Sequence, residues 1–173
     1  MITIISGTNK KDSNSRFIAR HYLNALAGKE QEVKMLCLSE IDFSFINNMM
    51  YSDRPEYVRE LQSEYFNPAE KFIFVVPEYN GSIPGALKFL IDALDVRSAF
   101  RDKKAALVGV ATGRAGNLRG LDHLTGILQH MRTNVMPGNL PISKVKDFLD
   151  AEGNLDPDTN KLIEDHVSRL IKY

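Results

Sequence analysis

The sequence predicts an α/β protein in which a parallel β-sheet lies between two layers of helices. Short apolar, β-branched runs alternate along the chain with segments whose apolar residues recur at helical spacing. Two of these runs, residues 71–76 (KFIFVV) and 105–111 (AALVGVA), are almost wholly apolar, as strands buried on both faces of a sheet are. Because a helix follows each predicted strand, the connections are those of parallel strands.

The first half of the chain supplies two strands and two helices. Residues 2–5 (ITII) are β-branched and end at a Ser-Gly pair, which predicts a strand followed by a turn. Residues 15–26 have apolar residues at helical spacing and predict a helix. A second strand is predicted at residues 32–38. Residues 54–66 predict a second helix, in whose first turn Pro55 is tolerated.

The second half continues the alternation. Strands are predicted at residues 71–76, 105–111 and 134–136, and helices at 84–94, 118–131 and 158–171. Proline stops the first of these strands and opens the helix after it, and the last helix has a single apolar stripe. Five strand–helix units predict a flavodoxin-like three-layer sandwich with a five-stranded parallel sheet of order 2-1-3-4-5.

Length and composition narrow the class of protein. The 173 residues fit one domain, residues 1–173, that buries its own core. Lys plus Arg and Asp plus Glu each number 22, so no excess of basic charge points to nucleic acid or an anionic membrane. Cys37 is the single cysteine, and the first apolar run is too short for a signal peptide, so we expect a cytoplasmic protein without disulfides.

The loop at residues 7–16 (GTNKKDSNSR) runs from the first strand into a helix. Ligands of such sheets bind at the carboxyl ends of the strands, where strand order reverses. Free amides at a helix N-terminus attract phosphate. The side chains that would assist are those of Thr8, Lys10, Ser13, Ser15 and Arg16. The loop matches neither GxxxxGK[ST] nor GxGxxG, and a polar loop in which Ser13 or Asn14 only caps the helix is the alternative.

The loop at residues 77–85 (PEYNGSIPG) follows the most apolar strand. Asn80-Gly81 predicts a tight turn with unusual dihedral angles, which lets the backbone approach a ligand closely. Pro77 and Tyr79 offer flat or apolar surface to a ring system, and the amides of residues 79–82 are candidate donors to its polar edge. An ordinary connection between strand and helix is the competing interpretation.

The loop at residues 112–117 (TGRAGN) places two glycines and a threonine between a strand and a helix. A backbone pressed against a flat ligand requires residues of this size. Arg114 is either a partner for an anionic group of the ligand or a solvated charge.

These motifs together resemble the NADPH-dependent FMN reductase family of flavodoxin-like proteins, which includes chromate, azo-dye and quinone reductases. The pattern PEYNGSxPGxLKxxID occurs almost unbroken at residues 77–92. The weaker first-loop pattern G-[ST]-x-R-x-x-S-x-[NT] is met by Gly7, Thr8, Ser13 and Ser15, with Lys10 where the family usually has arginine. The third loop is similar to the family's glycine-rich loop.

The resemblance implies FMN held non-covalently by the three loops. The implied cofactor-binding residues are Thr8, Lys10, Ser13, Asn14, Ser15 and Arg16 for the phosphate, Pro77, Glu78, Tyr79, Asn80 and Gly81 for the isoalloxazine, and Thr112, Gly113 and Arg114 on the third side. It also implies NADPH or NADH as donor and a small-molecule acceptor such as a quinone, azo dye, metal oxyanion or free flavin. Because the flavin carries the chemistry, no catalytic side chain is expected.

Two other functions remain open beside the reductase. A flavodoxin-like electron carrier is disfavoured by the zero net charge and the absence of tryptophan, and a flavin-free interaction protein is disfavoured by the second motif. Neither HExxH nor CxxC occurs, so no metal is expected. Cys37 is interpreted as a small buried residue rather than a thiolate.

The apolar stretch at residues 43–51 (FSFINNMMY) predicts either an interface or the cover of one sheet edge. Relatives are typically dimers with the flavin near the contact, so we expect a homodimer or tetramer. In such an assembly Met49, Met50 or Tyr51 would lie near the cofactor of the other subunit.

Overall fold

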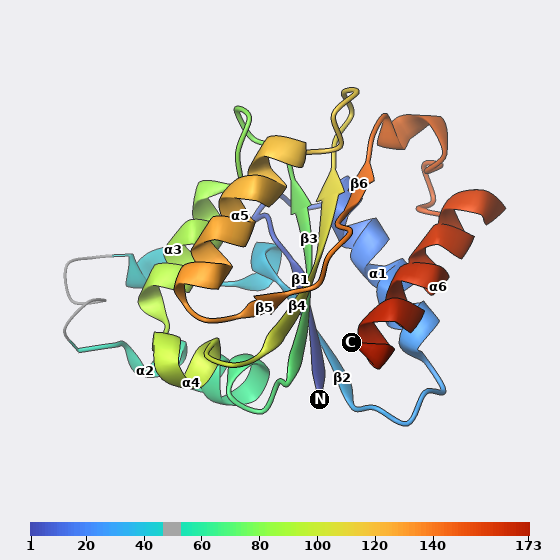
Figure 1. Ribbon diagram of the computed structural model, residues 1–173. Coiled ribbons are helices and arrows are strands. Elements are labelled where there is room, and N and C mark those ends of the chain that lie inside the picture. The colour runs from blue at the N-terminus through green and yellow to red at the C-terminus, as the bar shows by residue number, and fades with distance from the viewer. Residues whose placement is uncertain (47–52) are drawn as a thin grey trace.

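The computed structural model describes residues 1–46 and 53–173, and it has the predicted α/β architecture (Figure 1). The expectation for Met49, Met50 and Tyr51 falls outside the described residues. The strands are β1 (Ile2–Ser6), β2 (Val33–Cys37), β3 (Lys71–Pro77), β4 (Lys104–Val110), β5 (Asn134–Val135) and β6 (Leu140–Ile142). The helices are α1 (Asn14–Leu26), α2 (Glu56–Leu61), α3 (Gly85–Ala93), α4 (Val96–Ala99), α5 (Leu118–His130) and α6 (Pro157–Lys172).

The sheet is parallel and has the order β2-β1-β3-β4-β5, as predicted. β5 pairs with the first residues of β4. The last residues of β4, Val108–Val110, pair with β6, a strand that was not predicted. A turn containing Pro137 and Gly138, the latter at φ +83°, separates the two strands. The fifth position of the sheet is therefore shared by two short strands.

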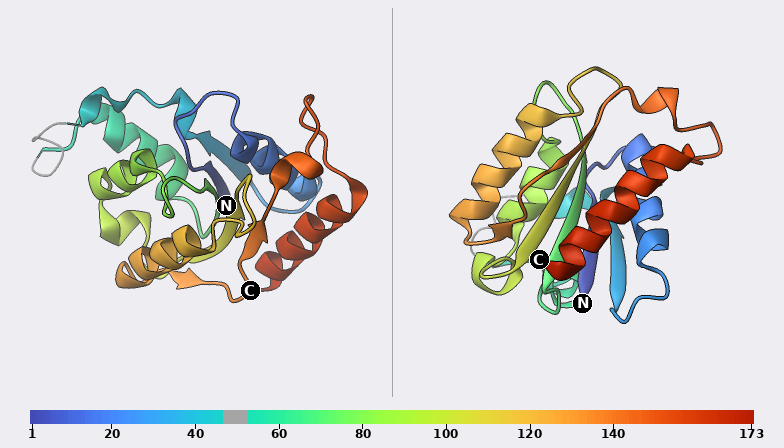
Figure 2. Two further views of the ribbon diagram at one scale, coloured as in Figure 1. Left: turned by 90° about the horizontal axis from the view of Figure 1, so that it is seen from above. Right: turned by 45° about the vertical axis from the view of Figure 1, so that its right-hand side comes forward.

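Helices cover both faces of the sheet (Figure 2). Alternate residues of each strand enter opposite layers, as the two-residue period requires. Phe72 and Phe74 pack beneath α2, α3 and α5, whereas Ile73 and Val75 pack beneath α1 and α6. Phe45 is buried in the first of these layers. That burial supports the sheet-edge alternative for the described part of residues 43–51.

The helices differ from the prediction in two places. Beyond α2, the predicted helix 54–66 continues as a π-helical turn over Gln62–Phe66. The short α4 was not predicted, and Asp95 caps it by accepting a hydrogen bond from the Ser98 amide. Neither departure touches the carboxyl ends of the strands. No helix in the described ranges is long and apolar enough to cross a membrane.

α6 packs against α1, and the two helices share a buried polar contact. The Tyr22 hydroxyl lies 2.7 Å from Nδ1 of His166. Burial, and then the charge of Arg169, lower the pKa of His166 from its ordinary 6.5 to about 4. The imidazole is therefore neutral at pH 7. Because α1 carries the first loop, this contact supports the position of that loop.

Candidate functional site

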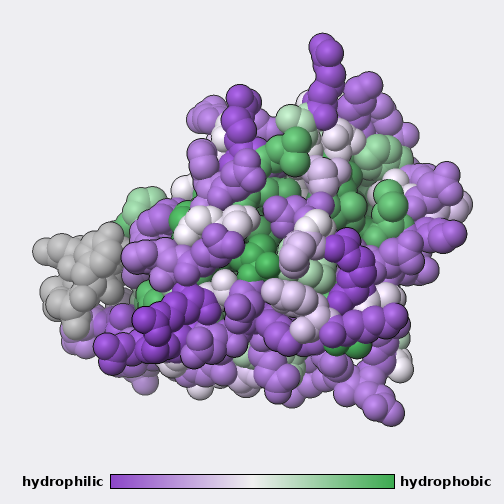
Figure 3. All heavy atoms as spheres, viewed as in Figure 1, coloured by the Kyte–Doolittle hydropathy of each residue, from purple (hydrophilic) through white to green (hydrophobic). Residues whose placement is uncertain are grey.

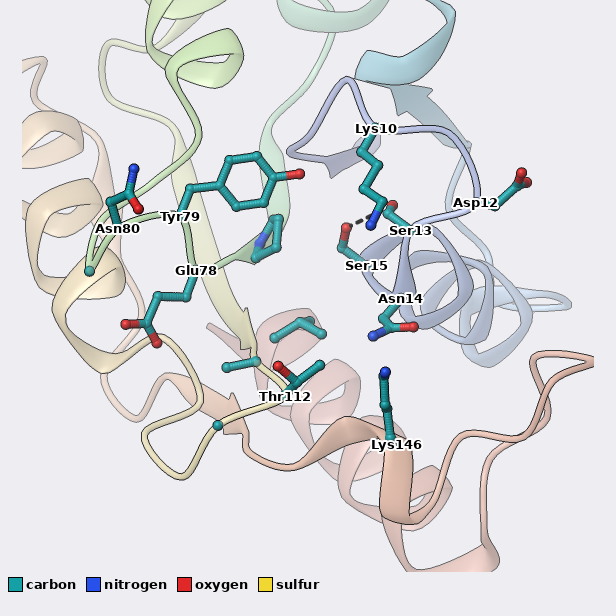
Figure 4. A pocket seen from close by; sticks show the side chains of 15 residues that line it. Lys10, Asp12, Ser13, Asn14, Ser15, Glu78, Tyr79, Asn80, Thr112 and Lys146 are labelled. Atoms are coloured by element: carbon teal, nitrogen blue, oxygen red, sulfur yellow. Dashed lines mark hydrogen bonds between the residues drawn. The ribbon is translucent and has the colours of Figure 1, made fainter.

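The three predicted loops meet at the carboxyl edge of the sheet and line one cleft of about 620 Å³. Clefts of this size are typical of cofactor sites. Eleven of the predicted residues line it: Lys10, Ser13, Asn14, Ser15, Pro77, Glu78, Tyr79, Asn80, Gly81, Thr112 and Gly113. Asp12, Val110, Ala111 and Lys146 also line it and were not predicted. Figure 4 shows the first loop on one side of the cleft and the other two loops facing it.

The first loop presents the start of α1 to the cleft. Ser13 caps the helix and its Oγ accepts a hydrogen bond from the Arg16 amide. The Ser13 and Ser15 hydroxyls lie 3.1 Å apart, and both side chains are buried. The first amides of a helix have no partner within the helix, and the other described residues give none to those of Asn14 and Ser15. This end of the cleft therefore offers hydroxyl and amide donors to an anion.

The second loop is a tight turn at the opposite wall. Tyr79 and Ser82 exchange two backbone hydrogen bonds of 3.0 Å, and Asn80 and Gly81 both have positive φ, +51° and +74°. These are the dihedral angles of a type I′ turn, which favours Asn-Gly. The amides of Tyr79 and Ser82 are thus committed to the turn. Of the amides expected to face a ring, only those of Asn80 and Gly81 lack a backbone acceptor within the described ranges.

Thr8 fixes the aromatic side chain of the second loop. Its buried hydroxyl lies 2.7 Å from the Tyr79 hydroxyl and accepts a hydrogen bond from the Lys10 amide. Thr8 does not line the cleft. Its position joins the first and second loops, so the Tyr79 ring is held at the cleft wall.

Glycines allow the third loop to pack closely against the sheet. A Cβ on Gly109 in β4 would lie 2.0 Å from the carbonyl oxygen of Gly116, and a Cβ on Gly116 would lie 2.7 Å from Cβ of Pro141. The next residue, Asn117, has φ +64° and donates from Nδ2 to the Val76 carbonyl at 3.0 Å. These contacts hold Thr112 and Gly113 at the edge of the cleft.

Besides Thr8, two further predicted residues, Arg16 and Arg114, do not line the cleft. The Arg16 guanidinium forms an ion pair with Glu40 and hydrogen-bonds Ser39 after β2, and Arg114 is exposed on the third loop. Arg119, at the start of α5, is also exposed, and its guanidinium lies 3.7 Å from the Glu78 carboxylate. Glu78 itself lines the cleft.

Cys37 and the histidines contribute nothing to the cleft lining. Cys37 is buried, and that burial, followed by the charge of Glu40, raises its pKa, so it is not a thiolate at pH 7. Nδ1 of His123 lies 2.8 Å from the Ser82 hydroxyl at the outer side of the second loop. The interpretation of Cys37 as a small buried residue is confirmed.

The sequence matches the family described as NADPH-dependent FMN reductase over residues 1–147, and the chain belongs to that family. A NADPH azoreductase of Bacillus sp. (strain OY1-2) is 29% identical, with 99% of this chain and 91% of that protein covered. A 2-hydroxy-1,4-benzoquinone reductase of a Burkholderia species is 27% identical, with 99% and 94% covered.

A solved structure has the same fold. The flavoenzyme NAD(P)H:(acceptor) oxidoreductase FerB of Paracoccus denitrificans superimposes with a TM-score of 0.82 at 22% identity, covering 99% of this chain and 95% of that one. The predicted fold and family are therefore confirmed. The chain is an oxidoreductase of the flavodoxin-like fold that uses FMN and NADPH.

Proposed function

We propose that the cleft binds FMN, with the phosphate at the start of α1 and the isoalloxazine between the second and third loops. One observation carries this assignment: a cleft of about 620 Å³ has serine hydroxyls and helix amides at one end and Pro77, Tyr79 and Gly113 at the other. A phosphorylated ring system has the same distribution of polar and flat surface. When bound, FMN supplies hydride and electron transfer between NADPH and an acceptor.

The described residues fit this cofactor at both ends. The hydrogen-bonded pair of Ser13 and Ser15 hydroxyls and the first amides of α1 would donate to the phosphate, and the positive end of the helix favours it. The amides of Asn80 and Gly81 are available to the polar edge of the ring. Gly113 has open space where a Cβ would be, so a ring can approach the backbone there.

The protein's part in the reaction is to hold and orient. The hydrogen bond between Thr8 and Tyr79 fixes one wall, and the packing of Gly116 on Pro141 fixes the other. We assign no nucleophile or metal ligand, because the transferred electrons pass through the cofactor. The nicotinamide and the acceptor would bind one after the other at the open side of the cleft.

The acceptor is proposed to be a small molecule such as a quinone or an azo compound, since relatives that match 99% of the chain are named for these activities. Arg119 and Arg114, both exposed near the second and third loops, are the candidate partners for the NADPH 2′-phosphate. We further propose a cytoplasmic enzyme, in keeping with the single buried cysteine.

We propose a homodimer or tetramer because apolar side chains are exposed on the surface. Polar side chains cover most of the face in Figure 3, and apolar side chains show in its upper half, around the ends of the central strands and β6. Large apolar side chains are exposed on several helices, among them Phe89 and Val96, each 41% accessible, and Leu118, 50% accessible. Such exposure favours association between copies of the chain.

Anaerobic spectroscopy of the purified protein tests the function. We expect a yellow protein whose flavin absorbance bleaches with NADPH and returns when a quinone or azo dye is added. Protein that stays yellow with both NADPH and NADH would instead be an electron carrier. Colourless protein whose titration leaves the spectrum of added FMN unchanged would refute the cofactor assignment.

A further inference from the structure

Lys146 enters the cleft from a segment outside the three loops. It lies on a 3₁₀ turn, Val145–Asp147, after β6. The turn is fixed to the third loop because the Lys144 amide donates to the Gly113 carbonyl at 2.9 Å and the Val145 amide donates to the Ala111 carbonyl at 3.0 Å. The Val145 side chain is fully buried. The backbone that carries Lys146 is therefore held in place, while its side chain remains exposed.

The Lys146 side chain points toward the start of α1. In Figure 4 its ammonium group lies beside Asn14. Lys10 extends from the opposite side toward Ser13 and Ser15 of the same helix start. Both lysines line the cleft. No carboxylate pairs with either of them within the described ranges.

The negative groups that line the cleft do not balance these two charges. The Asp12 carboxylate points away from the cleft, and Glu78 lies at the other end, 3.7 Å from Arg119. Two ammonium groups and the start of α1 therefore line the same cleft. Two cationic side chains beside a helix N-terminus favour an anionic ligand, and favour it more when that ligand carries two negative charges.

We propose that Lys146 is a second cationic partner of the FMN phosphate and that, with Lys10, it selects the dianion of a phosphate monoester. The proposal rests on the proposed function. A phosphate monoester loses its second proton near pH 6 and carries close to two charges at pH 7. Riboflavin has no phosphate, and each phosphate of FAD carries one charge. The pair of lysines therefore favours FMN over both.

The experiment measures binding to the flavin-free protein rather than turnover. FMN, riboflavin and FAD are titrated into the wild-type protein, Lys146→Gln, Lys146→Arg and Lys144→Gln, with flavin fluorescence as the readout. Lys144→Gln is the matched control because it removes the same charge two residues away, from an exposed side chain that does not line the cleft. Thermal unfolding of each variant checks its folding.

We expect Lys146→Gln to weaken FMN binding by about tenfold and to leave riboflavin binding unchanged, because one charge-assisted contact is lost. Lys144→Gln should match the wild type, and Lys146→Arg should restore FMN binding. The preference of the wild type for FMN over riboflavin should rise from pH 5 to pH 7, and this rise should be smaller in Lys146→Gln.

Three results would overturn the assignment of Lys146. Unchanged FMN affinity in Lys146→Gln would place its ammonium in solvent. Equal losses in Lys144→Gln and Lys146→Gln would assign the effect to net charge, and equal losses for FMN and riboflavin would assign it to the fold of the turn. In each of these cases the wild type still binds FMN and the proposed function stands. Wild-type protein that binds none of the three flavins would overturn the proposed function as well.

Discussion

Gly109 links the sheet to the third loop, and its substitution tests how closely the fold and the cleft depend on one another. In Gly109→Ala the new Cβ would lie 2.0 Å from the carbonyl oxygen of Gly116 and 3.1 Å from Cδ1 of Leu121. The nearest neighbour is backbone, which cannot rotate away as a side chain can. The loop must therefore move off β4 or the strand must deform.

The size of the effect follows from that distance. To reach even a tight contact of about 3 Å, the carbonyl of Gly116 must move by roughly 1 Å, and it is held on its other side by Pro141. Overpacking a well-packed interior costs about 1–3 kcal/mol, and we expect the upper end here. For a chain of this length, about 3 kcal/mol lowers Tm by roughly 6–12 °C.

The assay combines thermal unfolding with FMN titration. Gly109→Ala should lower Tm and also weaken FMN binding, because Thr112 and Gly113 belong to the displaced loop. Gly126→Ala is the control, since Gly126 lies inside α5 with open space around its Cβ position. There the same substitution should stabilise the protein by about 0.5–1 kcal/mol through the helix propensity of alanine.

A Gly109→Ala protein with wild-type Tm and FMN affinity would refute this reasoning, because it would show that the third loop shifts at no cost. A destabilised variant with unchanged FMN affinity would retain the packing argument. It would separate the position of the loop from the cofactor site.

Three further perturbations address the site and its support. Replacing Ser13 and Ser15 together with alanine should weaken FMN binding at least tenfold and spare riboflavin, because each bond to a charged group contributes about 1.5–3 kcal/mol; unchanged affinity would place the phosphate elsewhere. His166 alone should lower the free energy of unfolding by about 3 kcal/mol between pH 6.5 and pH 4, since the histidine of the unfolded chain binds a proton across that window whereas the buried imidazole begins to do so only near pH 4. Urea titrations of His166→Asn should lack most of that pH dependence, and an unaltered dependence would assign it to other groups. Asn117→Ala should lower the free energy of unfolding by about 3 kcal/mol, because it removes the hydrogen bond to the Val76 carbonyl and puts alanine at φ +64°. Asn117→Gly should lower it by less, since glycine adopts positive φ without strain. Equal losses in the two variants would show that φ is unimportant there.

The strands could be located because they differ plainly from the helices, and their order follows from the flavodoxin-like arrangement that five strand–helix units predict. Residues 71–76 and 105–111 are apolar at nearly every position, since both faces of β3 and β4 are covered. The second motif was equally informative, because Asn-Gly at positions 80 and 81 specifies the type I′ turn that the structure contains. These local signals fixed the sheet and one wall of the cleft.

Contacts between distant segments could not be predicted in the same way. Pro141 interrupts the pattern of β6, so the strand went unseen and with it the turn that brings Lys146 to the cleft. The Arg16 side chain was expected at the phosphate, but its partner Glu40 is 24 positions away in the sequence. In both cases the outcome depends on which segments the fold places side by side.

The role of Gly116 shows the same limit for small residues. From the sequence, the glycines of the third loop were expected to make room for a flat ligand. Gly116 instead makes room for Pro141 and for the strand at Gly109, whereas Gly113 is the glycine that lines the cleft. A pattern of glycines predicts that another group lies close to the backbone, but it does not distinguish a ligand from a neighbouring segment of the protein.

A crystal structure of the protein with FMN is the most direct test of the central assignment. We predict flavin density between the Tyr79–Ser82 turn and Gly113, with the phosphate within hydrogen-bond distance of the Ser13 and Ser15 hydroxyls. Density with the phosphate at the other end of the cleft, or with the ring away from these loops, would contradict it.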